Sequence, residues 1–359
     1  MSTISTADDW RTEESGPVDA ALHRILLCRR LPRAELHLHL TGALRPSVLA
    51  RLGYPVDRRH LDYGGVESFF AAHRDVAAHL RDAGVLREVV EHVLDGAADT
   101  GCRHVELSVN ASEFGSFPNG LTAALAAIGA AFESVRRRLG LSGGIIVAAD
   151  RAHDPSAGLD TVHTAAIARE HGAPVLGIGN DGFPAHRLAA FAGVYDEARH
   201  HGFRTTGHAN KPRDVPEALD LGLDRVDHAW ELQGRPELQR RFAEAGTPVT
   251  MAMTSCLMML PGRFPAAAAY PLDEVRRAGV RVTLNTDDAA MFFTDSAQEH
   301  LLAATTYDWD PATLADITTA SLEAAWIEPS LRPALLAAWR TETRALLDNP
   351  RCPDRGVKL

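Results

Sequence analysis

Residues 33–40 have the sequence RAELHLHL, in which apolar and polar side chains alternate with a period of two, so the stretch predicts a β-strand. Seven further short runs rich in β-branched or apolar residues follow, with segments of helical composition between them. The seven runs are residues 102–110, 143–150, 174–181, 203–209, 225–229, 247–254 and 281–288. Eight alternations of strand and helix predict an α/β fold, the (β/α)8 or TIM barrel.

The segments between the predicted strands complete this picture. Those with the composition and length of helices are residues 120–139, 159–171, 187–201 and 214–221. The gap between the first two strands, residues 41–101, is too long for one crossover helix, so we expect inserted helices there that cap the barrel mouth. The tail after Pro311 is also expected to be helical and to pack outside the barrel. No linker or repeat interrupts the chain, so residues 1–359 are expected to form a single domain.

Composition restricts the class of protein. The net charge of −10, from 37 Lys and Arg against 47 Asp and Glu, argues against nucleic acid or an anionic membrane as a partner. The densest basic run, residues 136–138, is expected at the solvated end of a helix. The four cysteines lack CxxC or framework spacing, the N-terminus lacks an apolar segment, and no apolar run reaches the roughly 20 residues that span a bilayer. We therefore expect a cytoplasmic protein with reduced thiols; homo-oligomerisation stays open.

His37 and His39 lie two residues apart on the first predicted strand, so both imidazoles point to one face and can bind one metal ion. The pattern alone is weak, because 17 histidines in 359 residues produce about 0.8 such triplets by chance. Its position is more informative. The pair lies near the C-terminal end of the strand, and barrel active sites lie at that end.

Further chemically competent side chains end other predicted strands: His208 the fifth, His228 the sixth, and Asp287 and Asp288 the eighth. Any one of them alone is as well explained as a hydrogen-bonded polar residue at a strand end. Together, imidazoles and a carboxylate at one face predict a zinc site, with Fe²⁺, Co²⁺ or Ni²⁺ as alternatives. A metal ion there would lower the pKa of a bound water to about 7, and a neutral His and an ionised Asp beside that water would orient it and accept its proton.

The remaining histidines carry less information. His153, just after the third predicted strand, is left unassigned. Seven others fall in helical or loop segments and are expected to be solvated: His73, His79, His92, His163, His171, His200 and His201. Cys256 lies in a Met-rich apolar run, which favours a place in the core or in a pocket wall over a nucleophile.

Several blocks of the sequence resemble a known family. The blocks AELHLHLTGALRP (34–46), GFRTTGHAN (202–210), RVDHA (225–229) and GVRVTLNTDDAAMF (279–292) are similar, in this order, to the signature blocks of the adenosine deaminase family. The resemblance implies one Zn²⁺ per chain, held by His37, His39, His208 and Asp287. It also implies that His228 orients the hydroxide and that Asp288 hydrogen-bonds the substrate heterocycle.

Two further blocks extend the resemblance. GIGNDG (177–182) is similar to the family's glycine-containing substrate loop, which implies substrate contacts from Gly179 and Asp181. MTSC (253–256) is similar to the family's block after the seventh strand.

The chain departs from the family pattern on the substrate side. The family has His-Ala-Gly-Glu, whose glutamate protonates a ring nitrogen, whereas this chain has HANK with Asn210 and Lys211. The family also has an acid after the metal pair, which holds the sugar or lies beside it; this chain has Thr41. Both changes remove a carboxylate and leave every implied metal ligand in place. We therefore interpret the chain as a divergent member without the catalytic Glu, in which Thr41, Asn210 and Lys211 face the substrate.

Lys211 allows three interpretations. Its ammonium can pair with an anionic substrate group, it can act as a general acid with a lowered pKa, or it can point to solvent while Asn210 or water fills the space. A cation beside a metal ion is repelled unless an anion lies between them.

The leading functional hypothesis is a metal-dependent hydrolase acting on a small molecule. Metal hydroxide would attack an amino-bearing carbon of a purine-like or other nitrogen heterocycle, and ordinary adenosine is not expected to be a good substrate. One alternative keeps the metal but performs C–N hydrolysis, ring opening or elimination on an anionic specialised metabolite recognised by Lys211. Another is a non-catalytic nucleoside-binding protein.

Overall fold

Eight parallel strands form the centre of the protein, which is described here by a computed structural model covering residues 17–55 and 65–349. The first sheet contains, in order, β1 (Arg33–His39), β2 (Cys102–Asn110), β3 (Ser142–Asp150), β4 (Val175–Asp181) and β5 (Arg204–Thr205). The second contains β6 (Val226–Asp227), β7 (Val249–Met251) and β8 (Val282–Leu284). Single bridges, Leu38 with Asp287 and His208 with Asp227, join the two sheets and close the barrel that the sequence predicts.

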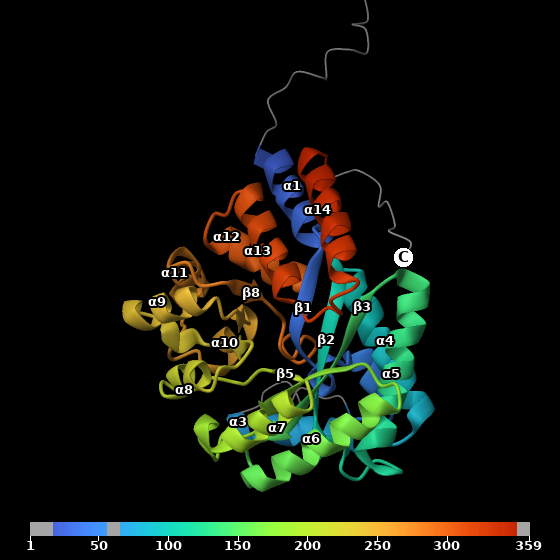
Figure 1. The fold of residues 1–359 in the computed structure, drawn as a ribbon. Coiled ribbons are helices and arrows are strands. Elements are labelled where there is room, and N and C mark those ends of the chain that lie inside the picture. Colours follow the sequence, from blue (N-terminus) through green and yellow to red (C-terminus); the bar gives the residue numbers. More distant parts are fainter. Residues whose placement is uncertain (1–16, 56–64, 350–359) are drawn as a thin grey trace, which may run out of the picture.

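Helices surround these strands on the outside (Figure 1). They include α4 (Ala83–Ala98), α5 (Gly120–Leu139), α6 (Pro155–Glu170), α7 (Ala192–His200), α8 (Asp214–Asp220), α9 (Pro236–Ala245), α10 (Met253–Met259), α11 (Leu272–Arg277) and α12 (Ser296–Thr306). Every residue of β1 is buried, because one face lies inside the barrel and the other lies under helices. The basic run 136–138 lies in the last turn of α5, where positive charge complements the helix dipole, and its arginines are exposed.

The C-terminal tail packs outside the barrel, as expected. Helices α13 (Pro311–Ala324) and α14 (Arg332–Asp348) lie beside α1 (Pro17–Arg30), near the end of the barrel where β1 begins (Figure 1). Ala34 and Leu36 of β1 form a buried apolar cluster with Leu322 and Trp339 of these helices. This cluster attaches α13 and α14 to β1.

The insertion between β1 and β2 caps the barrel mouth. It contains η2 (Thr41–Ala43), α2 (Pro46–Arg51), α3 (Val66–Ala77) and α4. Helix α3 contributes Val66, Phe69, Phe70 and His73 to the wall of a cavity at the strand C-termini. The extra helices predicted from the length of this segment are therefore confirmed, and α3 is the one that covers the site.

The later strands are shorter than the sequence predicts, and the difference lies at the barrel mouth. Strand β5 ends at Thr205, so His208 follows the regular ladder and is not part of it. His228 and Asp287 adopt φ angles of 64° and 62°, a left-handed conformation that few non-glycine residues take and that ends regular pairing. Single backbone bridges and side-chain contacts continue the connection there; for example, the backbone N–H of His208 donates to Oδ1 of Asn180 over 2.7 Å.

Three of the four cysteines lie in the described part of the chain. Cys28, Cys102 and Cys256 are buried and free, and Cys352 lies outside the described residues. Burial raises the pKa of the Cys28 thiol to about 11 and that of Cys102 to about 12, so these side chains behave as small apolar groups. In the part of the chain that the structure describes, no helix is both long and apolar enough to cross a membrane.

A candidate metal centre at the barrel mouth

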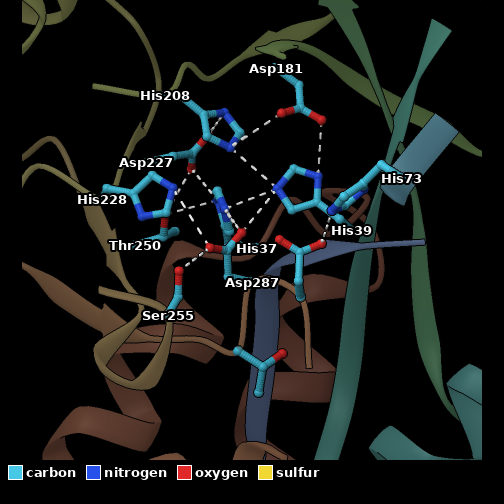
Figure 2. A network of polar contacts seen from close by, with 12 residues as sticks. His37, His39, His73, Asp181, His208, Asp227, His228, Thr250, Ser255 and Asp287 are labelled. Carbon is cyan, nitrogen blue, oxygen red and sulfur yellow. Dashed lines mark hydrogen bonds and ion pairs between the residues drawn. The ribbon is translucent and has the colours of Figure 1, made fainter. Parts of the chain in front are cut away.

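Four side chains converge on one point at the C-terminal end of the barrel. His37 and His39 come from β1, His208 follows β5 and Asp287 follows β8, and their ligand atoms all lie within 4.8 Å of one another. Nε2 of His37 lies 3.0 Å from Oδ1 of Asp287, and Nε2 of His39 lies 3.2 Å from the same oxygen and 3.2 Å from Nε2 of His208. Figure 2 shows these imidazoles arranged around the carboxylate of Asp287.

Each of the three imidazoles is held through its other nitrogen. Nδ1 of His37 lies 3.2 Å from Oδ1 of Asp227, and Nδ1 of His39 lies 3.2 Å from Oδ2 of Asp181. Nδ1 of His208 donates to the carbonyl of Asn180 over 2.5 Å. A proton on each Nδ1 leaves the Nε2 lone pair free to coordinate, which is how metal-ligating histidines are usually oriented. Three such nitrogens and a carboxylate fit a divalent metal ion.

Asp287 and His208 are in the protonation states that can bind a metal ion. Burial raises the pKa of Asp287, but the surrounding imidazoles outweigh it and hold the pKa well below its usual range, so the group is a carboxylate. Burial, together with His37 and His39, lowers the pKa of His208 to about 4, so this imidazole is neutral. Ser255 donates to Oδ2 of Asp287 over 2.5 Å and leaves Oδ1 facing the histidines.

His228 lies beside the four ligands without joining them. Its Nε2 is 4.0 Å from Oδ2 of Asp287, and its ring is 4.8 Å from that of His37. Burial lowers the pKa of His228 to about 3, so the ring is neutral at physiological pH. Among the described residues its Nδ1 has no hydrogen-bond partner. Nε2, the nitrogen that faces Asp287, is the one placed to hydrogen-bond a molecule at the centre.

A cavity of about 160 Å³ opens over this centre. That is roughly ten times the 10–15 Å³ that admits one water molecule, so the cavity has room for a small heterocycle. Its apolar wall is formed by Phe69, Phe70, Trp230, Met259, Leu260 and Phe292, and its polar part by His39, His73, Asp181, His208, Asn210, Lys211, His228, Asp287 and Asp288. Cys256 also lines it, as the sequence favours.

The predicted substrate residues fall into two groups. Asp181, Asn210, Lys211 and Asp288 line the cavity. Thr41 and Gly179 do not: Thr41 lies behind His73, with Oγ1 2.7 Å from its Nδ1, and Gly179 lies inside the barrel between Ile146 and Thr206. The last glycine of the same loop, Gly182, lines the cavity instead.

Lys211 is exposed at the rim of the cavity. Among the described residues no carboxylate lies within the 4.0 Å of an ion pair with its ammonium group, and no hydrogen bond to that group is formed. Asn210, which precedes it, is half-buried and also faces the cavity. Position 211 thus presents to the cavity rim a cation without an ion-pair partner in the described part of the chain.

His73 is the main correction to the sequence-based assignment. We expected a solvated side chain, but α3 packs over the mouth and leaves the ring only 3% exposed. Burial lowers its pKa, yet the carboxylates of Asp288 and Glu113 outweigh this and raise the pKa to about 10. The other six histidines of that set are exposed or half-buried.

Sequence reasoning also missed the residues that support the ligands. Asp227 was the easiest of them to find from the sequence, because it directly precedes His228 in the RVDHA block. It accepts hydrogen bonds from Thr206 and Thr250, each over 2.8 Å, in addition to its contact with His37. No local pattern distinguishes Ser255 or Glu113 from other polar residues near strand ends.

Comparison with known proteins identifies the family. The sequence pattern of the family described as adenosine deaminase matches residues 32–340. The chain belongs to the adenosine deaminase family. An adenine deaminase from Sinorhizobium medicae is 30% identical over 322 residues, which cover 86% of this chain and 98% of that protein.

Solved structures agree with this membership. A zinc-bound amidohydrolase from Burkholderia ambifaria is 27% identical, covers 95% of this chain and 97% of its own, and superposes with a TM-score of 0.81. The adenine deaminase of Arthrobacter aurescens, 22% identical over 88% of this chain and 99% of its own, has the same fold with a TM-score of 0.80. The chain is therefore a metal-dependent hydrolase of the deaminase type, with a divalent metal as cofactor and a small molecule as substrate.

Proposed function

We propose that this enzyme uses zinc to remove the amino group from a purine-like heterocycle, as a free base and not as ordinary adenosine. The observation that carries the proposal is the metal centre at the floor of a cavity sized for one heterocycle, with His228 and Asp288 beside it. The adenine deaminases among its relatives support a free base as the substrate. Position 41, where the family has the acid that holds the sugar or lies beside it, also supports a free base. Thr41 at this position lies behind His73 and outside the cavity wall.

The residues of the centre have separate roles in this chemistry. A divalent ion held by His37, His39, His208 and Asp287 would lower the pKa of a bound water to about 7. His228, which is neutral and directs Nε2 toward Asp287, orients the attacking water. Asp287 is ionised, so this carboxylate can accept the proton of that water.

The remaining groups hold the substrate. Asp288 hydrogen-bonds a ring nitrogen, and the aromatic side chains Phe69 and Phe292, stacked at 5.5 Å, form an apolar wall beside it. Apolar side chains around a bound heterocycle strengthen each polar contact made to it. The family's ring-protonating glutamate has no carboxylate counterpart at position 211.

Lys211 supports a second candidate function. An exposed ammonium group at the rim, with no carboxylate partner in the described part of the chain, is available to an anionic substrate group. The same metal centre would then hydrolyse a C–N bond, or open or eliminate from a ring, in a heterocycle that carries a carboxylate or phosphate. The two candidates differ in whether the preferred substrate is neutral or anionic.

Ammonia release by the zinc-loaded protein tests the leading proposal. We expect turnover of adenine or a related amino-bearing base. Adenosine should be deaminated about 10²- to 10⁴-fold more slowly than by a family member that keeps the glutamate, the usual cost of a missing general acid. Efficient adenosine deamination would contradict the proposed substrate. Release of no ammonia from any amino heterocycle, with zinc bound, would contradict deamination altogether.

Anionic analogues separate the second candidate from the first. If Lys211 binds an anion, carboxylated heterocycles will be preferred over neutral ones, and Lys211→Met will abolish the preference without changing zinc content. Equal rates for both kinds of analogue would leave the neutral base as substrate.

A further inference from the structure

A second group of potential metal ligands lies in the outer helical layer. His163 on α6, with Glu197 and His201 at the end of α7, places two imidazole nitrogens and a carboxylate oxygen within 4.8 Å of one another. None of these three residues lines the cavity at the barrel mouth. Apart from the catalytic centre, no other three His, Cys, Asp or Glu side chains in the described part of the chain come together in this way.

Helical geometry brings Glu197 and His201 to one face. The backbone N–H of His201 donates to the carbonyl of Glu197 over 3.1 Å, so the four-residue spacing of the helix still holds at His201, which caps α7. Helix α6 packs against α7 (Figure 1) and presents His163 to this face. Arg169 of α6 donates to the carbonyl of His201, and its guanidinium lies 3.9 Å from the ring centre of Phe203. These contacts hold the end of α7 against α6, so a metal ion would not have to bring the two helices together.

The two imidazoles approach the same carboxylate oxygen. Nε2 of His163 lies 3.0 Å from Oε1 of Glu197, and Nε2 of His201 lies 3.1 Å from it. The catalytic centre has the same arrangement, with two Nε2 atoms 3.0 Å and 3.2 Å from one oxygen of Asp287. Zinc bonds of about 2.0–2.2 Å in a tetrahedral site separate neighbouring ligand atoms by about 3.4 Å. The surface group therefore needs shifts of only a few tenths of an ångström to hold a metal ion.

The chemistry of these ligands selects the class of ion. Imidazole nitrogens suit Zn²⁺, Co²⁺, Ni²⁺ and Cu²⁺, whereas Mg²⁺ and Ca²⁺ prefer sites made of oxygen ligands. The carboxylate supplies negative charge that attracts a cation. Nδ1 of His163 and Nδ1 of His201 make no hydrogen bond with another described residue. Either ring can therefore carry its proton on Nδ1 and leave the Nε2 lone pair to the metal ion.

This group of ligands is open to solvent. The side chain of His163 is 53% exposed, and those of Glu197 and His201 are each 32% exposed, whereas the catalytic ligands are at most 11% exposed. A metal ion can enter directly, and water can complete its coordination. Three exposed ligands release an ion more readily than the four buried ligands of the catalytic centre, so we expect the outer group to fill second.

We propose that His163, Glu197 and His201 form a second, exchangeable metal site for Zn²⁺ or a chemically similar divalent transition-metal ion. The ion joins α6 to α7 on the outside of the barrel and takes no part in the reaction at the cavity. The inference is independent of the proposed substrate, because none of the three ligands lines the cavity. The alternative is a surface ion pair of the same side chains, which binds no metal and contributes little to stability.

Zinc titration of the enzyme that already carries its catalytic zinc, followed by calorimetry, tests the site. The wild type should bind one further Zn²⁺ per chain in a weaker, saturable event that excess Mg²⁺ does not suppress. His163→Gln and His201→Gln each replace a ligand by a side chain that can still hydrogen-bond Glu197. Each should weaken the event by more than about 100-fold, because losing a ligand costs more than losing a partner that only orients one. Absence of the event in the wild type, or its persistence in both variants, would overturn the inference.

Two controls locate the event. His171, also exposed, lies at the end of α6 outside the group, with Nδ1 2.7 Å from the carbonyl oxygen of Ile167, so His171→Gln should bind the further ion as the wild type does. His39→Ala, titrated from the metal-free state, should lose the tight event of the catalytic centre and keep the weaker one. Excess zinc should raise the melting temperature of the wild type and of His171→Gln more than that of His163→Gln. Loss of the weaker event in either control, or an equal temperature shift in all three proteins, would refute the assignment.

Discussion

Asp227 orients His37 of the metal centre, and the variant Asp227→Asn measures how much this contact contributes to metal binding. Its Oδ1 lies 3.2 Å from Nδ1 of His37, and the side chain is 3% exposed, so water cannot replace the lost charge. The four ligands all remain in Asp227→Asn, and the amide can still pair with the hydroxyls of Thr206 and Thr250. The variant therefore loses ligand orientation and basicity while keeping the site itself.

The expected loss is about 10- to 100-fold in zinc affinity, the range found for partners that orient a metal-bound histidine. This corresponds to about 1.4–2.8 kcal/mol. We expect the upper half of the range, because the contact is buried and His37 has no second acceptor of equal charge at Nδ1. Competition with a chelator of known affinity, at fixed pH, measures the change.

Asp273→Asn is the matched control. Asp273 is also buried, but it binds Arg276 and Trp309 on the outside of the barrel. It should lower the melting temperature without changing zinc affinity. Unchanged zinc affinity in Asp227→Asn, with the fold intact by circular dichroism, would refute the role given to this carboxylate.

Three other outcomes are expected. Gly42→Ala should displace Asp288, weakening substrate binding and destabilising the fold by about 1–3 kcal/mol while zinc content stays the same; titration calorimetry and chemical denaturation test this. Lys211→Met should raise KM for an anionic substrate about 10- to 150-fold with kcat little changed. A fall in kcat, together with loss of one limb of the pH profile, would instead assign Lys211 as a general acid. Removal of the metal by a chelator should abolish activity and lower the melting temperature. A ligand that binds only the folded state, at a concentration 100 times its Kd, stabilises that state by about 2.7 kcal/mol. A melting curve unaffected by chelator would contradict a bound metal.

Much of the site was predictable because its residues lie in recognisable local patterns. His37 and His39 share a face through the two-residue period of a strand, and His208, His228 and Asp287 mark the C-terminal ends of predicted strands. A closed parallel barrel brings all strand C-termini to one face, so predicting the fold was enough to bring these residues together.

Residues outside the strands were harder to place. His73 lies on a helix in an insertion, and its helical pattern is the same whether α3 faces solvent or covers the cavity. Only the packing of α3 over the mouth buries it at 3% exposure beside Asp288. The loop at 177–182 was also hard to place, because the sequence does not show which of its glycines lines the cavity. The path of the backbone puts Gly182 at the cavity and Gly179 inside the barrel.

The sequence by itself determined the barrel and the set of side chains that converge as candidate metal ligands, since these depend on periodicity and on the type of residue at strand ends. Tertiary structure alone decided the partners of each group: Asp227 for His37, Asp181 for His39, and Thr41 with Glu113 for His73. These pairs join residues from different strands and loops. Their contacts depend on distances of a few ångströms between segments far apart in the chain, which no local pattern encodes.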